Sequence, residues 1–116
     1  MESKELRKGN FVKYIYSDKE FSVVDGFDSE YVFLNEITAD YAEHSEVEPI
    51  PLAEEWLVKF GFINDGRYLR IDKVKITFRN GCWRFEFGGV KVMLRNVHQL
   101  QNLYFALTGQ ELIIKL

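Results

Sequence analysis

The sequence has 116 residues, 47% of them hydrophobic and 28% charged, with a formal net charge of −3. These values are those of one globular domain with its own core, and they exclude a chain that is disordered throughout. Cys82 is the only cysteine, which excludes an internal disulfide and a four-cysteine metal site. No apolar run approaches the roughly 18 residues of a membrane span, and no signal peptide is evident. We therefore expect a single cytoplasmic domain over residues 1–116.

The small net charge conceals two regions of opposite sign. Residues 1–58 hold five Lys and Arg against fourteen Asp and Glu, whereas residues 59–95 hold nine Lys and Arg against three acids. Each region produces its own electric field, so the net charge of the whole chain does not indicate the kind of partner.

Three short strands are predicted in the first 50 residues. They cover residues 11–16, 20–25 and 31–34, and turn-forming residues separate them. Residues 47–50 are a candidate closing strand, so this region is either an antiparallel meander or a small SH3-like barrel. The acidic stretch at residues 40–48 is expected to be mainly a solvated loop.

A short helix is predicted over residues 52–60. Its apolar side chains recur at the spacing of one helical face, and they are Leu52, Trp56, Leu57 and Phe60. Gly61 suits the left-handed position after the last turn, and Phe62 is then expected to pack back on Leu57.

The segment from Val74 to Arg95 has the clearest pattern in the chain. Asn80-Gly81 is a strong signal for a two-residue hairpin turn, because both central residues of a type I′ turn need positive φ. This turn opposes Ile76 to Phe85, and a second turn at Gly88-Gly89 extends the pairing to a third strand. We predict a three-stranded antiparallel meander, with residues 67–71 as a candidate fourth strand.

The same register sorts the side chains of the meander onto two faces. One face is apolar and is expected to enter the core, with Val74, Ile76, Phe78, Trp83, Phe85, Phe87, Val90, Val92 and Leu94. The other face carries five cations, which are Lys75, Arg79, Arg84, Lys91 and Arg95. Glu86 lies opposite both Lys75 and Lys91, so opposite charges meet across the strand pairs.

A second helix is predicted over residues 97–107, with Asn96 as its N-cap and Gly109 just past its end. No charged residue occurs from Asn96 to Gln110, which is typical of a helix buried on more than one side. One side is expected to cover the aromatic face of the meander, and the other to contact either the N-terminal strands or another subunit. A last strand is predicted over residues 111–116. The expected fold class is α+β, with a three- to four-stranded C-terminal meander packed on one helix.

Four blocks of the sequence carry a resemblance. They are LRKGN at residues 6–10, PIPL and EEWL within residues 49–57, KFGF at residues 59–62, and VHQLQNLYFALTG at residues 97–109. In this order they resemble a family of uncharacterised proteins from Bacteroides-type bacteria and their prophages. No activity, cofactor or catalytic residue is attached to that family, so the resemblance implies a phage or mobile-element setting and no mechanism.

The residue types needed for catalysis or metal binding are sparse. His44, His98 and Cys82 fall in different predicted elements, so neither a zinc ligand set nor a base for a Cys82 nucleophile is indicated. Paired carboxylates occur only in a turn and at a helix start, where solvation is expected. We therefore expect no enzyme, no metal and no cofactor.

Two functions are carried forward as hypotheses. The first is a non-catalytic interaction module, self-associating in one version, whose partner surface is formed by His98, Gln101, Asn102 and Phe105. The alternative is a nucleic-acid-binding protein that uses the basic sheet face, although an inward-facing set of aromatic residues leaves no ring to stack on bases. An acidic N-terminal half that acts as a nucleic-acid decoy is a third interpretation.

Overall fold

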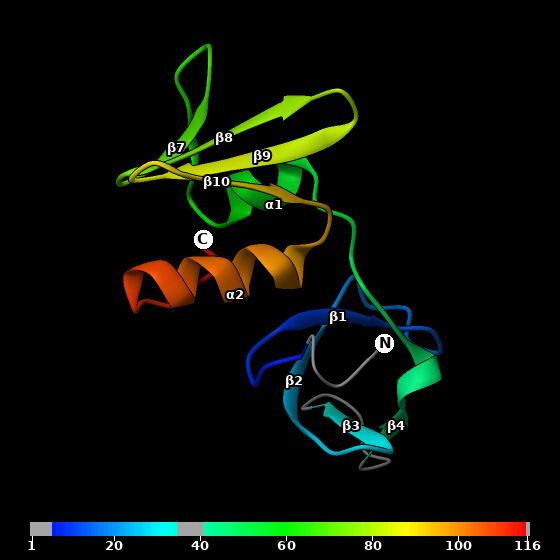
Figure 1. The fold of residues 1–116 in the computed structure, drawn as a ribbon. Helices are drawn as coiled ribbons and strands as arrows, with labels where there is room; N and C mark the ends of the chain where they lie inside the picture. Colours follow the sequence, from blue (N-terminus) through cyan, green and yellow to red (C-terminus); the bar gives the residue numbers. More distant parts are fainter. Residues whose placement is uncertain (1–5, 35–40, 116) are drawn as a thin grey trace.

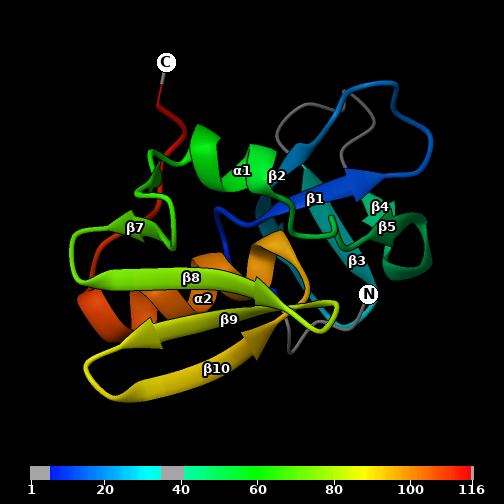
Figure 2. The ribbon, with the colours of Figure 1, turned by 90° about the horizontal axis from the view of Figure 1, so that it is seen from above.

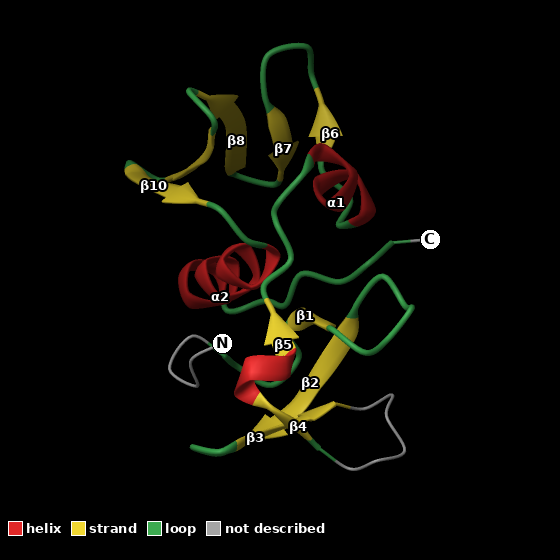
Figure 3. Cartoon of the chain, turned by 90° about the vertical axis from the view of Figure 1, so that its right-hand side faces the viewer, coloured by secondary structure: helices red, strands yellow, loops and turns green. Residues whose placement is uncertain are grey.

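The computed structural model describes residues 6–34 and 41–115, which form two antiparallel sheets and two α-helices (Figure 1). The predicted α+β class is confirmed. In Figure 1 the C-terminal sheet lies at the top, and helices α1 (Glu54–Lys59) and α2 (Val97–Thr108) lie beneath it. The N-terminal strands lie below α2, and the view of Figure 3 shows the same order. Helix α2 is therefore a middle layer between two sheets.

The N-terminal sheet has the strand order β4-β3-β2-β1-β5. Its strands are β1 (Phe11–Tyr14), β2 (Ser22–Phe27), β3 (Tyr31–Leu34), β4 (Ala42–Glu43) and β5 (Val47–Glu48). Strand β5 pairs with β1, as a closing strand would, but no pairing of β4 with β5 is found among the described residues. The region is thus the predicted meander rather than a closed barrel.

The prediction of a loop over residues 40–48 is wrong for residues 42–48, of which Val47 and Glu48 form a strand as the alternative prediction for residues 47–50 expected, and residue 40 lies outside the described residues. Strand β4, a 3₁₀ helix (His44–Glu46) and strand β5 follow one another here. The reason is that Ala42 and Val47 are buried, at 1% and 2% exposure, so two small apolar residues anchor a stretch whose acids face solvent.

The C-terminal sheet has the strand order β10-β9-β8-β7-β6. Its strands are β6 (Ile63–Asn64), β7 (Leu69–Ile71), β8 (Val74–Arg79), β9 (Cys82–Phe87) and β10 (Val90–Leu94). The predicted register is confirmed, because Ile76 pairs with Phe85 and Phe85 with Val92. Asn80 and Gly81 have φ values of +50° and +78°, as their turn requires. Strand β7 confirms the candidate fourth strand, and β6 adds a fifth.

Most of the apolar face of this sheet is buried, but one residue at each end of it is not. Val74, Ile76 and Phe85 have no exposed surface, whereas Phe78 is 57% exposed and Val90 is 39% exposed. The prediction that Phe78 and Val90 enter the core is therefore wrong. Phe78 stands at the tip of the β8–β9 hairpin, where its ring contacts that of Trp83 at 4.9 Å between centroids. A residue can point to the core side of a sheet and still lie beyond the helices that cover it.

Both helices are capped as the sequence predicts. Asn96 and Gln99 form a capping box at the start of α2, and Gly109 is left-handed at its end. After α1, the N–H of Phe62 donates to the carbonyl of Leu57 at 3.0 Å, around a left-handed Gly61. Residues 111–115 form no strand, which corrects that prediction, and residue 116 lies outside the described residues.

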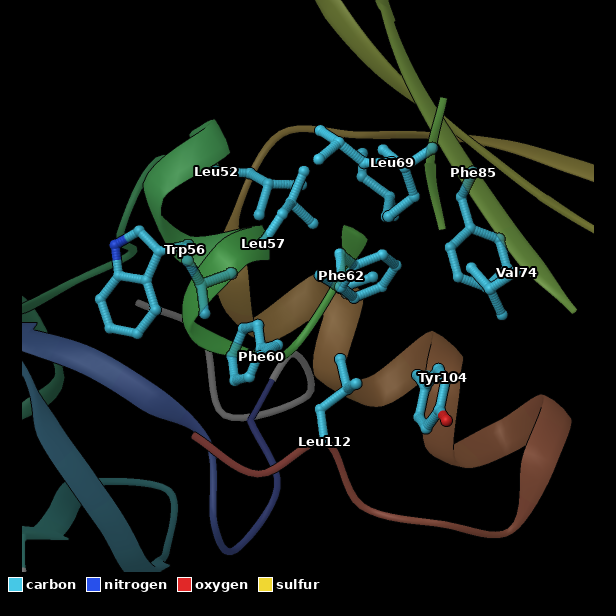
Figure 4. Packing of buried hydrophobic residues seen from close by; sticks show 14 of the residues in the cluster. Leu52, Trp56, Leu57, Phe60, Phe62, Leu69, Val74, Phe85, Tyr104 and Leu112 are labelled. Atoms are coloured by element: carbon cyan, nitrogen blue, oxygen red, sulfur yellow. The ribbon is translucent and has the colours of Figure 1, made fainter. Parts of the chain in front are cut away.

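The larger core lies between the C-terminal sheet and the two helices (Figure 4). Phe60, Phe85 and Leu57 are among its fully buried side chains. Phe11 of β1 stacks on Phe60 at 5.8 Å between ring centroids, so this core reaches into the N-terminal sheet. A smaller cluster of mostly aliphatic residues lies within that sheet: Leu6, Val12, Val24, Val32, Leu34, Ala42 and Val47.

Candidate functional site

The charge-free face of α2 is covered by the N-terminal segment of the same chain. His98 and Gln101 are each only 1% exposed. The Gln101 amide oxygen accepts the Phe11 N–H at 2.8 Å, and its amide nitrogen donates to the Gly9 carbonyl at 3.1 Å. These two residues, which the sequence suggested as part of a partner surface, are therefore inside the fold. An uncharged amide is suited to this place because it satisfies a backbone donor and a backbone acceptor together.

Asn102 and Phe105 continue the same contact. The Asn102 side-chain oxygen accepts from Asn10 at 2.7 Å and from the Arg7 guanidinium at 3.1 Å. Arg7 also lies over the Phe105 ring, 4.4 Å from its centroid, and forms an ion pair with Glu111. Of the four predicted interface residues only Phe105 is exposed, at 40%. The second neighbour of α2 is thus the N-terminal region of this chain, one of the two alternatives left open by the sequence.

The outer face of the C-terminal sheet is not covered. Figure 2 looks onto strands β8, β9 and β10 with no helix in front of them, and Figure 1 shows both helices on the opposite side. The five predicted cations are on this outer face or at its margin, and Arg79, Lys91 and Arg95 are exposed. The sequence therefore located an open basic surface correctly.

The register aligns charges across four strands of this face. Arg70, Lys75, Glu86 and Lys91 form one row. Glu86 lies 3.9 Å from the Arg84 guanidinium, and Arg70 forms an ion pair with Asp65. Within the described part of the chain, Arg79, Lys91 and Arg95 form no ion pair. Cations therefore remain in excess on this surface, which we call the basic face and define as Arg70, Lys75, Arg79, Arg84, Lys91 and Arg95.

An aromatic ring that the sequence analysis did not assign also lies on the basic face. Tyr68 is half-buried, and the cationic groups of Arg67, Arg70 and Lys75 lie 5.7, 5.2 and 5.3 Å from its ring centroid. The two-residue connection at residues 72–73 sets β7 against β8 and pairs Arg70 with Lys75. Counting back from that pair would have placed Tyr68 on the outer side.

Asp65 holds the loop that carries Arg67 and Tyr68. Its carboxylate accepts the backbone N–H groups of Tyr68 at 2.7 Å and Arg67 at 3.0 Å. These two bonds, followed by that from Arg70, lower the pKa of Asp65 to about 2. The loop is therefore organised by a carboxylate that stays ionised at neutral pH.

Two hollows lie beside the exposed Phe78. The first, about 560 Å³, is the more apolar of the two, and its lining includes Leu52, Ile76 and Trp83 together with the polar Glu54, Asn64 and Arg67. The second, about 230 Å³, is polar and is lined by three arginines, Arg67, Arg79 and Arg84, together with Glu86. Arg67, Tyr68, Thr77 and Phe78 line both hollows, so the two are adjacent. We call them the apolar hollow and the arginine hollow.

The histidines and the cysteine that the sequence offered for catalysis or metal binding lie in different parts of the fold. The described residues contain no group of three or more His, Cys, Asp or Glu side chains able to hold a metal ion. His44 Nε2 lies 2.7 Å from the Asp28 carbonyl, in the N-terminal sheet, whereas His98 is buried on α2. Cys82 is half-buried at the start of β9.

No family model, curated protein or solved structure matches the chain. No helix in residues 6–34 and 41–115 has the length and apolar character needed to cross a bilayer. The assignment of a function therefore depends on the surfaces of this molecule alone.

Proposed function

We propose that this protein is a non-catalytic binding module whose contact surface is the basic face and whose partner is nucleic acid. The supporting observation is an uncovered sheet face with six cations, of which Arg70 is paired with Asp65 and Arg84 lies near Glu86, so that cations remain in excess. Such a surface suits a phosphate backbone, because each cation that contacts a phosphate releases a condensed counterion. The phage or mobile-element setting implied by the resemblance, and a cytoplasmic location, belong to the same proposal.

Two details support nucleic acid over a small acidic ligand. The cations extend over four strands rather than around one point, as expected for a chain of phosphates. Tyr68 also places a ring among the cations, where guanidinium groups and aromatic surface can contact nucleotides together.

Fluorescence anisotropy with a labelled oligonucleotide tests this proposal. Affinity is expected to fall steeply between about 50 and 200 mM salt, with a slope that reflects the number of phosphate contacts. Lys91→Glu and Arg84→Glu are each expected to weaken binding and to lower the salt slope by about one or more. Lys8→Glu makes the same charge change as Lys91→Glu at an exposed lysine of the N-terminal segment, and it should leave binding nearly unchanged. Absence of binding at low salt would end the proposal.

A protein partner is the second candidate, and the exposure of Phe105 supports it. This ring is 40% exposed on a helix without charges, and it is the most exposed member of the predicted partner surface. Size-exclusion chromatography with light scattering on the wild type and on Phe105→Glu tests the self-associating version. A wild type that is monomeric at all concentrations would remove that version.

A further inference from the structure

The tip of the β8–β9 hairpin presents an aromatic ring that the fold itself does not use. Phe78 is 57% exposed, although every other aromatic residue of the meander is at least half-buried. Its neighbour Trp83 is held in place, because the indole N–H donates to the Leu52 carbonyl at 2.8 Å. The Phe78 ring therefore packs against a tryptophan that is itself held in place, and more than half of Phe78 is exposed to solvent.

The two hollows that share this ring differ in chemistry. The apolar hollow brings together the aliphatic and aromatic side chains of Leu52, Ile76 and Trp83. The arginine hollow brings together three guanidinium groups and one carboxylate. A nucleotide has the same division, with a flat base that prefers aromatic surface and a phosphate that prefers arginine. The distance between the two chemistries is short, since Thr77 and Phe78 line both hollows.

We propose that the hairpin tip binds one unpaired nucleotide, with the base stacked on Phe78 in the apolar hollow and its phosphate in the arginine hollow. This inference rests on the proposed function and adds to it a preference for single strands. A base in a duplex is stacked and paired, so it cannot enter a hollow at a hairpin tip without leaving its helix. The basic face supplies contacts to the neighbouring phosphates on either kind of strand.

Tryptophan fluorescence provides a direct readout of this site. The chain contains two tryptophans; Trp83 touches Phe78, whereas Trp56 is 5% exposed and packs among Phe11, Phe21 and Phe60. A base that stacks on Phe78 is expected to change the emission of Trp83. Titration with a short single-stranded oligonucleotide should change the tryptophan emission. The same sequence as a duplex should bind the basic face but change the tryptophan emission little.

Affinity measurements on three variants test the role of the ring. Phe78→Ala should weaken binding of the single strand roughly tenfold, the loss expected for one stacked base, and leave duplex binding unchanged. Phe78→Tyr keeps the ring and should bind like the wild type. Phe33→Ala removes another partly exposed phenylalanine, 37% exposed on β3, and should have no effect on either strand form. Circular dichroism checks that each variant is folded.

The outcomes separate this inference from the proposed function. If Phe78→Ala binds single strands as well as the wild type does, or if duplex and single strand bind equally, the inference is wrong and the salt-dependent basic face still stands. If no oligonucleotide binds at low salt, both proposals are wrong. If no oligonucleotide binds and the wild type self-associates but Phe78→Ala does not, the hollows belong to a contact between protein molecules.

Discussion

The two sheets of this protein have five strands each, but they maintain their registers in different ways. In the C-terminal sheet each strand pairs with its neighbour in sequence, and two-residue turns join β8 to β9 and β9 to β10. In the N-terminal sheet β1 pairs with the distant β5, and the register of β2 with β3 shifts between Val24 and Gly26. The register of the C-terminal sheet is thus set by short turns between neighbouring strands. That of the N-terminal sheet also depends on a pairing between strands far apart in the sequence, β1 and β5.

The sheets also differ in what fills their cores and in the charge that surrounds them. Aromatic and large aliphatic side chains fill the C-terminal core, and small aliphatic ones fill the N-terminal cluster. The N-terminal region is acidic and the C-terminal sheet is basic. We therefore expect the C-terminal sheet to supply most of the stability, and it also carries the proposed binding surface. Four measurements test these differences between the two sheets.

The largest effect is expected from Phe85→Ala. Phe85 has no exposed surface and lies at the centre of the C-terminal sheet, so its loss should lower the free energy of unfolding by about 3–5 kcal/mol. Val32→Ala, which is equally buried in the N-terminal cluster, should cost about 2 kcal/mol. Phe78→Ala deletes the same atoms as Phe85→Ala at an exposed site and should cost less than about 1 kcal/mol. Urea denaturation measures all three, and equal losses at Phe85 and Phe78 would contradict the assignment of the core.

The next largest effect is expected at the contact between α2 and the N-terminal segment. Gln101→Met keeps the side-chain size but removes the hydrogen bonds of Gln101 to Gly9, Asn10 and Phe11, which leaves the Phe11 N–H and the Gly9 carbonyl without this partner. Stability should fall by about 2–3 kcal/mol. Hydrogen exchange at the Phe11 amide should accelerate by more than exchange within β8 and β9. Gln110→Met, at an exposed position past α2, is the matched control and should change neither quantity.

A smaller effect is expected at the turns. Gly81 has a φ of +78°, and no atom beyond its chain neighbours lies within 4 Å of the position that a Cβ would take. Gly81→Ala should therefore cost about 1–2 kcal/mol from backbone strain alone. Gly26 in β2 has ordinary backbone, and an added Cβ would meet Phe33 at 3.7 Å, an ordinary contact, so Gly26→Ala should be nearly neutral. Thermal or urea denaturation compares the two, and a larger loss at Gly26 would show that the N-terminal sheet is the more constrained one.

The smallest effect concerns Asp65 and is local. Because backbone hydrogen bonds lower its pKa from the ordinary value of 3.8 to about 2, the ionised form stabilises the β6–β7 loop above pH 4. That contribution is lost as the pH falls from about 4 through 2. NMR titration of the Asp65 carboxyl carbon should give a midpoint well below that of a solvated aspartate, with the Tyr68 amide shifting in parallel. A midpoint near 4 would mean that the loop is not held in this way.

Local patterns in the sequence predicted the C-terminal sheet well. Asn80-Gly81 and Gly88-Gly89 each require a turn of defined length, and a turn of defined length sets which residues oppose each other. The capping residues Asn96 and Gly109 likewise marked the ends of α2, because they satisfy backbone groups of the helix to which they belong. In contrast, residues 42–46 were predicted only as a loop, since a strand of two residues is too short to show an alternation.

Of the candidate surfaces, likewise, one was predicted from a local pattern and the other depended on contacts between distant parts of the chain. The basic face followed from the register, because alternate residues of a strand point to opposite sides. The prediction of a partner surface at His98 and Gln101 was wrong, because both residues are buried against the same chain. A helix face without charges is equally suited to another subunit and to a neighbouring segment of its own chain. Phe78 was placed in the core for a related reason, since its side was predicted correctly and its coverage was not.

The amino-acid sequence by itself determined the class of the fold, the ends of its helices and the two faces of the C-terminal sheet, because each depends on residues a few positions apart. In contrast, the sequence did not show that residues 7–11 cover α2, or that the β8–β9 tip extends past the helices and leaves Phe78 beside three arginines. Whether a residue is buried depends on which other elements cover it, and those elements come from distant parts of the chain.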